Sequence, residues 1–197
     1  MTQRAASVLA GVDVAGRGPL AGPVVAAAVI LGSGFQYEDL ADSKKLSERK
    51  REEVNLEVRK QARAWSIGLA SAAEIDQFNI HTATLIAMRR AVLGLPFEPE
   101  RVIVDGNFTP NLPWPSTATP RADATETSVS AASVLAKVFR DRYMRDLDEQ
   151  FPEYGFGQHK GYPTRVHLEA LEHFGPSLVH RFSFRPVREA LRTPGRT

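Results

Sequence analysis

Several apolar segments of β-strand length occur along the chain, and two of them end in an aspartate. Residues 8–14 and 101–106 are mostly apolar up to Asp13 and Asp105, and each aspartate is followed by a glycine within three residues. A third segment, residues 23–31, is an apolar run of strand length that is rich in β-branched residues and bounded by Gly22 and Gly32, as expected of a strand. A strand that ends in a carboxylate places a charge at the rim of a sheet, where α/β proteins bind their ligands.

Helical patterns alternate with these strands. Ser71 and Glu74 have the spacing of a capping box, in which each side chain satisfies a free backbone N–H of the other residue. The alternation predicts an α/β sheet with helices on both faces. The predicted elements are helices at residues 47–62, 79–95, 125–150 and 164–174, a strand at 65–70, and a loop at 110–120 with one short strand.

The composition excludes several classes of protein. The chain has no cysteine, which rules out disulfides, thiolate metal sites and a cysteine nucleophile. No apolar run approaches the roughly 20 residues that span a bilayer, and the N-terminal segment leads directly into Asp13, which favours a strand over a signal peptide. With 43% apolar and 24% charged residues, the chain is expected to be a soluble cytoplasmic protein without a membrane partner.

The basic residues gather in two clusters, although the net charge is only +2. Such clusters fit a phosphate-rich partner, or else the solvated face of a helix, an alternative that Glu48, Glu52 and Glu53 favour for the first cluster through local pairing. The first cluster contains Lys44, Lys45, Arg49, Lys50 and Arg51, and the second contains Arg181, Arg185, Arg188, Arg192 and Arg196.

Asp13, Asp105 and a third acid, Asp123, which directly precedes the helix predicted from residue 125, are candidate metal ligands. Each one alone fits equally well as a turn former or a helix cap. Together they would repel one another unless cations lay between them. Ligand sets made only of oxygen favour Mg²⁺ or Mn²⁺, and two such ions about 3.5–4 Å apart can promote phosphodiester hydrolysis. The five histidines lack zinc-like spacing and are expected at the surface or at helix caps.

A series of motifs resembles ribonuclease HII, the type 2 ribonuclease H family, in order and spacing over nearly the whole chain. A lone GRG would carry no weight, whereas the ordered set is highly specific. The motifs are GVDVAGRGPLAGPV at residues 11–24, DSKKL at 42–46, EID at 74–76 with NI at 79–80, VDGN at 104–107, ADA at 122–124, SAASVLAK at 130–137 with RD at 140–141, and GFGQHKGYPT at 155–164.

The resemblance implies roles for individual residues. Asp13, Asp105 and Asp123 match three of the family's four metal-binding acids. The Gly16-Arg17-Gly18 motif matches the loop whose backbone senses the ribonucleotide 2′-hydroxyl, which distinguishes RNA from DNA; it would also make a plain tight turn.

Three further residues are implied to bind substrate. Tyr162 matches a tyrosine that packs against the next deoxyribose, although an aromatic residue here would also suit a core. Lys44 and Lys45 are expected to hold backbone phosphate.

The resemblance also implies a fold and a reaction. The fold is a ribonuclease H-like mixed five-stranded sheet flanked by helices, with residues 1–145 as the catalytic domain and residues 146–197 as a C-terminal helical substrate-binding region of one compact unit. The chain is expected to be a monomer that uses two Mg²⁺ or Mn²⁺ ions. It would cut on the 5′ side of ribonucleotides in RNA–DNA hybrids, and of single ribonucleotides in duplex DNA during ribonucleotide excision repair.

Position 14 departs from the family pattern, because Val14 stands where the motif Asp-Glu-Ala-Gly-Arg-Gly has its glutamate. Valine cannot ligate a cation, so the metal site loses one carboxylate and the activity is expected to be attenuated. Valine suits a strand, and the fold should tolerate it. The change is compatible with an introduced substitution, a natural variant in which water or a neighbouring acid fills the gap, or a sequence error. The alternative function is a non-catalytic protein that binds RNA–DNA junctions.

Overall fold

The computed structural model describes residues 8–35 and 46–192, and its centre is a single mixed sheet. The sheet has five strands in the order β3-β2-β1-β4-β5. Neighbours among the first three strands are antiparallel, whereas β4 is parallel to β1 and β5 is parallel to β4. The prediction of a mixed five-stranded sheet is therefore confirmed. The strands are β1 (Leu9–Ala15), β2 (Val24–Leu31), β3 (Ala62–Ala70), β4 (Arg101–Asp105) and β5 (Ser116–Thr119).

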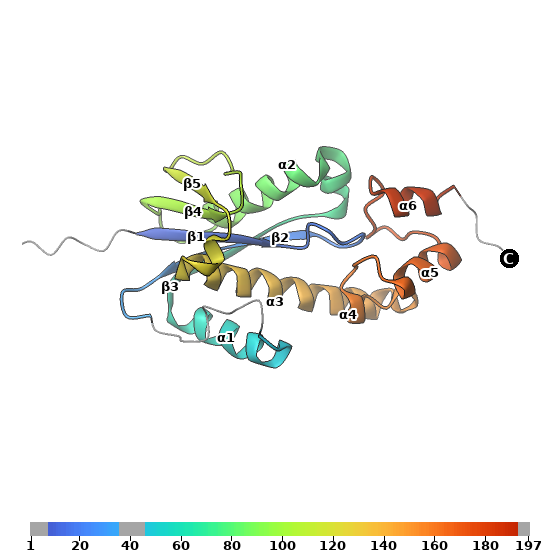
Figure 1. Ribbon diagram of the computed structural model, residues 1–197, viewed down its shortest axis with the longest axis horizontal. Coiled ribbons are helices and arrows are strands. Elements are labelled where there is room, and N and C mark those ends of the chain that lie inside the picture. Colours follow the sequence, from blue (N-terminus) through green and yellow to red (C-terminus); the bar gives the residue numbers. More distant parts are fainter. Residues whose placement is uncertain (1–7, 36–45, 193–197) are drawn as a thin grey trace, which may run out of the picture.

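Helices cover both faces of the sheet. Helix α2 (Ala72–Leu93) lies on one face, and α3 (Thr127–Gln150) with α1 (Glu48–Gln61) lies on the other (Figure 1). Successive residues of β2 alternate between two apolar cores: Ala26 and Ala28 belong to the core under α2, and Val25 belongs to the core under α3. Because both faces are covered, β2 is apolar nearly throughout rather than alternating.

The start of α2 follows the capping signal in the sequence. The Ser71–Glu74 capping box is present at the start of α2. The helix expected from residue 79 therefore begins earlier, at Ala72, and it is interrupted at Asn79 (φ 66°). The Asn79 side chain accepts a hydrogen bond from the backbone N–H of Thr82 at 3.1 Å, so it caps the second segment of α2 as an N-cap residue would.

Helix α3 packs directly on β1 because Gly11 has no side chain. A Cβ atom at Gly11 would lie 2.3 Å from the backbone carbon of Ser128, a distance at which no side chain fits. This close approach holds the first turns of α3 against β1, and Ser133 of α3 bonds to Asp13 near the end of that strand.

The C-terminal elements gather at one end of the sheet (Figure 1). Helix α3 continues through residue 146 to Gln150, and the division of the chain near that residue stays a prediction. Within residues 8–35 and 46–192, no helix is both long and apolar enough to cross a bilayer. The C-terminal elements are η3 (Pro152–Tyr154), α4 (Phe156–His159), α5 (Arg165–Phe174) and α6 (Arg185–Ala190).

The prediction that all the histidines lie at the surface or at caps is wrong for three of them. His159, His167 and His180 are at most 8% exposed and form a cluster in the C-terminal region. The rings of His159 and His167 stack with centroids 4.5 Å apart, and the Nε2 atoms of His167 and His180 are 3.1 Å apart. The remaining ring nitrogens of these two residues bond to backbone groups of Tyr162 and Ser177, so the cluster is satisfied with neutral rings.

Acid is expected to destabilise the fold through this cluster. Burial lowers the pKa of His167 to about 4 and that of His180 to about 3, whereas an unfolded histidine titrates near 6.5. Below pH 6.5 these two histidines therefore bind more protons in the unfolded chain, and their contribution to stability falls as the pH falls, by about 1.4 kcal/mol per pH unit per histidine. Asp13, whose pKa is raised to about 7, offsets part of this loss, because it binds its proton in the folded state. Urea unfolding at pH 7 and pH 5 measures this loss. Equal stability at the two values would contradict the prediction, and the exposed His173, changed to Gln, should leave the loss unaltered.

Candidate functional site

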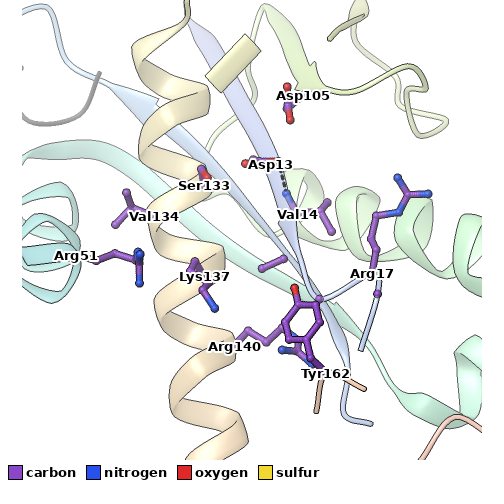
Figure 2. A pocket seen from close by; sticks show the side chains of 13 residues that line it. Asp13, Val14, Arg17, Arg51, Asp105, Ser133, Val134, Lys137, Arg140 and Tyr162 are labelled. Atoms are coloured by element: carbon purple, nitrogen blue, oxygen red, sulfur yellow. Dashed lines mark hydrogen bonds between the residues drawn. The ribbon is translucent and has the colours of Figure 1, made fainter. Parts of the chain in front are cut away.

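The ends of β1 and β4 bring two of the predicted aspartates together. Val12 pairs with Val104 in the parallel register of these strands, and Asp13 and Asp105 are the next residues along. Parallel neighbours in register point their side chains to the same face. Both aspartates line one cavity of about 410 Å³ (Figure 2), bounded by the β1 end, the turn after it, α1, α3 and Tyr162.

Asp13 is a buried carboxyl group in a polar setting. It is 9% exposed, and its Oδ1 accepts a hydrogen bond from the backbone N–H of Val14 at 2.7 Å. Burial, with smaller contributions from the charges of Asp105 and Asp123, raises the pKa of Asp13 to about 7, against the lowering effect of the bonds from Val14 and Ser133. A cation bound here would favour the ionised carboxylate, since an opposite charge stabilises that form.

Asp123 lies beside this pair but not in the cavity lining. Asp105 Oδ1 accepts a hydrogen bond from the backbone N–H of Ala122 at 2.8 Å, which ties the end of β4 to the short helix η2 (Ala122–Ala124). Asp123 is 5% exposed, and its charge acts on Asp13. Among the described residues, no three histidine, aspartate or glutamate side chains are arranged to hold a metal ion. The ligand roles of the three aspartates therefore stay predictions, although their oxygen donors fit Mg²⁺ or Mn²⁺.

Val14 contributes no donor to the cavity that it lines. Its side chain is partly buried and packs against the apolar core under α2. The two neighbours in sequence thus face opposite sides of β1, with Asp13 toward α3 and Val14 toward α2, as alternation in a strand requires.

Basic side chains from α1, α3 and the turn after β1 complete the cavity. Arg51 comes from α1 and Arg17 from the turn, whereas Lys137 and Arg140 come from α3. Lys137 Nζ donates to Asp141 Oδ1 at 2.7 Å. A cavity with two acids and several cations suits a ligand that carries phosphate together with a bound metal ion. Lys44 and Lys45, predicted to hold phosphate, lie outside the described residues.

The α3 residues of this cavity had no role predicted from the sequence. Ser133, Lys137 and Arg140 lie at positions i, i+4 and i+7 of α3, so they form a polar stripe along one side of the helix. That spacing was visible in the sequence. What it did not reveal was that the stripe faces Asp13 rather than solvent.

The Gly16-Arg17-Gly18 turn and Tyr162 meet at the cavity, as Figure 2 shows for Arg17 and Tyr162. Gly16 has φ +90°, and a Cβ there would lie 2.0 Å from Arg140 Nε, so only glycine fits. A Cβ on Gly18 would lie 3.6 Å from Tyr162 Cε1, which places the tyrosine ring against the turn. Tyr162 is 45% exposed, so it is open to a ligand and does not fill a core.

The chain is similar to a family model, a curated relative and solved structures of ribonuclease HII or ribonuclease H2. The model of the ribonuclease HII family matches residues 10–187. Ribonuclease HII of Vibrio vulnificus is 52% identical over 183 residues, covering 93% of this chain and 88% of that protein. The solved ribonuclease H2 of Pyrococcus horikoshii OT3 superposes with a TM-score of 0.78 at 24% identity, covering 93% of this chain and 97% of that one. Ribonuclease HII of Archaeoglobus fulgidus, solved in complex with PCNA, has a TM-score of 0.74 at 28% identity, with 90% and 95% covered.

Proposed function

This chain belongs to the ribonuclease HII family, whose members are nucleases of the ribonuclease H type, and from that premise we propose that it cuts nucleic acid next to ribonucleotides. The substrates are RNA–DNA hybrids and duplex DNA with single embedded ribonucleotides. Cleavage occurs on the 5′ side of the ribonucleotide and leaves a 3′-hydroxyl. The observation that carries this proposal is the single cavity shared by Asp13, Asp105, the Gly16–Gly18 turn and Tyr162.

The acidic end of the cavity is the reactive end. Asp13 and Asp105 would hold Mg²⁺ or Mn²⁺ there, and Asp123 would complete the ligand set. Two such ions, when bound, stabilise negative charge at the reacting phosphate. Ser133, which bonds to Asp13, would orient that carboxylate, as groups that bond to metal ligands do.

The other end of the cavity is the recognition end. A glycine-rich turn lets its backbone approach a sugar closely, and backbone groups can bond to a 2′-hydroxyl, the group that DNA lacks. Tyr162 lies against this turn and would pack on the next deoxyribose, where its ring leaves no room for another hydroxyl. Residues 146–197 would thus act as the substrate-binding region. The proposal also holds that the protein is a monomer and that it is located in the cytoplasm.

Arg51 is expected to hold phosphate without reading the sugar. Arg51→Gln should weaken binding to all-DNA and ribonucleotide-containing duplexes by the same factor, and it should reduce the slope of log affinity against log salt by about 0.9. Fluorescence anisotropy over a series of salt concentrations measures both effects. Arg49→Gln is the matched control, because Arg49 is 91% exposed and pairs with Glu53 on the surface of α1. An unchanged slope for Arg51→Gln would remove it from the interface.

Val14 supports a second candidate function. A site with one carboxylate fewer binds cations less well and loses rate, because catalytic groups act as a unit. The cavity and its basic residues would still bind a duplex. The alternative is therefore a protein that binds RNA–DNA junctions without cutting them.

One assay tests the proposal and separates the two candidates. A labelled duplex with one embedded ribonucleotide is incubated with the chain and Mg²⁺ or Mn²⁺, beside an all-DNA duplex. The proposal expects one cut on the 5′ side of the ribonucleotide and no cut in the all-DNA duplex. Tight, selective binding without any cut, even at high enzyme concentration, identifies the junction binder. The absence of both cutting and selective binding rejects both functions for this chain.

A further inference from the structure

Two arginines are buried at the recognition end of the cavity, Arg140 in its lining and Arg181 outside the lining, and both donate their hydrogen bonds to backbone carbonyls. Arg140 and Arg181 are at most 1% exposed. The negative charges of Asp141 and Asp76 act on Arg140 and Arg181, respectively, but neither carboxylate is hydrogen-bonded to its arginine. Asp76 accepts from the backbone N–H groups of Phe182 and Ser183, and Asp141 accepts from Lys137. Burying two neighbouring cations without a bonded acid is costly, so their positions call for an explanation beyond packing.

Arg181 bonds to the turn that carries the glycines. Its Nη2 donates to the carbonyl of Gly16 at 2.6 Å, its Nη1 to that of Arg17 at 3.0 Å and its Nε to that of Gly22 at 3.0 Å. One planar guanidinium therefore holds three carbonyls of the same loop, a task that its rigid fork of donors suits. The sequence predicted that Arg181 belongs to a basic cluster that binds phosphate or faces solvent. That prediction is wrong for Arg181, because its side chain is buried.

Arg140 joins the same loop to the segment before Tyr162. Its Nε and Nη2 donate to the carbonyls of Pro23 and Ala21, each at 3.1 Å, and its Nη1 donates to that of Lys160 at 3.0 Å. In Figure 2 the Arg140 side chain extends from α3 toward Tyr162. The backbone N–H of Leu20 also donates to the carbonyl of Gly161 at 2.7 Å. The two arginines thus set the turn and the tyrosine segment relative to each other.

The bonds of Arg181 determine which way two N–H groups point. In a trans peptide the C=O of one residue and the N–H of the next point in opposite directions, and the described residues contain no cis peptide. Since the carbonyls of Gly16 and Arg17 point to the buried guanidinium, the N–H groups of Arg17 and Gly18 point away from it. Both residues line the cavity, and within residues 8–35 and 46–192 neither N–H has a protein acceptor.

We propose that Arg181, supported by Arg140, is a positioning residue for ribonucleotide recognition, because it turns the N–H groups of Arg17 and Gly18 toward the 2′-oxygen of the substrate. This inference rests on the proposed function. Burial lowers the pKa of Arg181 to about 9 and that of Arg140 to about 10, so both remain charged at neutral pH. Their charge adds a positive field behind the phosphate-binding cavity.

The test is Arg181→Lys, which keeps the charge but loses the planar fork. Dissociation constants are measured in Ca²⁺ for a duplex with one ribonucleotide and for the same duplex in all-DNA form. We expect Arg181→Lys to lose about tenfold or more of the preference for the ribonucleotide duplex, with little change in the affinity for all-DNA. A merely structural role would weaken both affinities together and would overturn the inference. The matched control is Arg185→Lys, since Arg185 is exposed and pairs with Glu189.

The failure of this inference is distinguishable from the failure of the proposed function. If the unaltered chain does not prefer the ribonucleotide duplex, the proposed function fails. If it does prefer that duplex and folded Arg181→Lys retains the full preference, only the role of Arg181 fails.

A second measurement needs no variant and decides the question if Arg181→Lys does not fold. In ¹⁵N–¹H spectra of the unaltered chain, the amide signals of Arg17 and Gly18 should shift more with the ribonucleotide duplex than with all-DNA. Equal shifts with the two duplexes would overturn the inference.

Discussion

Val14→Glu is expected to raise the rate of cleavage at a single embedded ribonucleotide by roughly 100-fold or more. Val14 packs toward α2 but lies near the end of β1 and lines the cavity that holds Asp13 and Asp105, so the longer side chain of glutamate is expected to bring a carboxylate to that cavity. Members of a catalytic group contribute as a unit, so restoring one member can recover several orders of magnitude. Single-turnover rates in Mg²⁺ and in Mn²⁺, measured for both chains under the same conditions, give the ratio.

Val14→Gln is the matched control for this prediction. Glutamine has the shape of glutamate without its charge, so it should leave the rate near that of the unaltered chain. A similar gain for both variants would mean that polarity or packing, and not a metal-binding carboxylate, limits the reaction. If neither variant cuts while selective binding persists, the junction-binding alternative is supported.

Asp105→Asn is expected to lower cleavage by about a thousandfold or more, most measurably in a chain that also carries Val14→Glu. The Asp105 Oδ1 atom accepts a hydrogen bond from Ala122 N–H, and an asparagine oxygen can accept the same bond. The link between β4 and η2 should therefore persist while the negative charge is lost. Loss of one charged ligand at a metal-dependent site has this order of effect on rate. Single-turnover kinetics measure the change, and thermal melting checks the fold.

The same substitution at an exposed position of α3 provides the control. Asp146 is exposed on α3, away from the cavity lining, so Asp146→Asn should leave the rate within about twofold. A rate for Asp105→Asn within tenfold of its parent would remove Asp105 from the reactive end. The loss should appear equally in Mg²⁺ and Mn²⁺, because both ions require oxygen ligands.

Much of the fold was predictable because local patterns agreed with the final packing. The apolar run of β2, the capping box of α2 and the aspartates that end β1 and β4 each depend on neighbours within a few residues. The prediction of a short strand in the loop at residues 110–120 is confirmed by β5. These features follow from hydrogen bonding and side-chain periodicity, which act over one or two turns of chain.

Other features depend on contacts between distant residues, and no local pattern revealed them. Arg181 looked like a member of a solvated basic cluster, yet it reaches carbonyls more than 150 residues earlier. His167 and His180 looked like surface histidines, yet they bond to each other in a buried cluster. A charged or titratable side chain is placed by whichever polar groups remain unpaired around it, and those groups come from other parts of the chain.

The order of motifs was sufficient to indicate the family, and the alternation of strands and helices was sufficient to indicate the sheet. Both features consist of patterns among residues that are close together in the sequence. Tertiary packing decided the arrangement of the site. It placed Asp13 and Asp105 in the cavity with Asp123 beside them, turned the polar stripe of α3 toward Asp13, and buried two arginines behind the glycine turn. The physical reason is that a carboxylate or guanidinium acquires its role from the charges, donors and acceptors within a few ångströms, and only the folded chain brings those together.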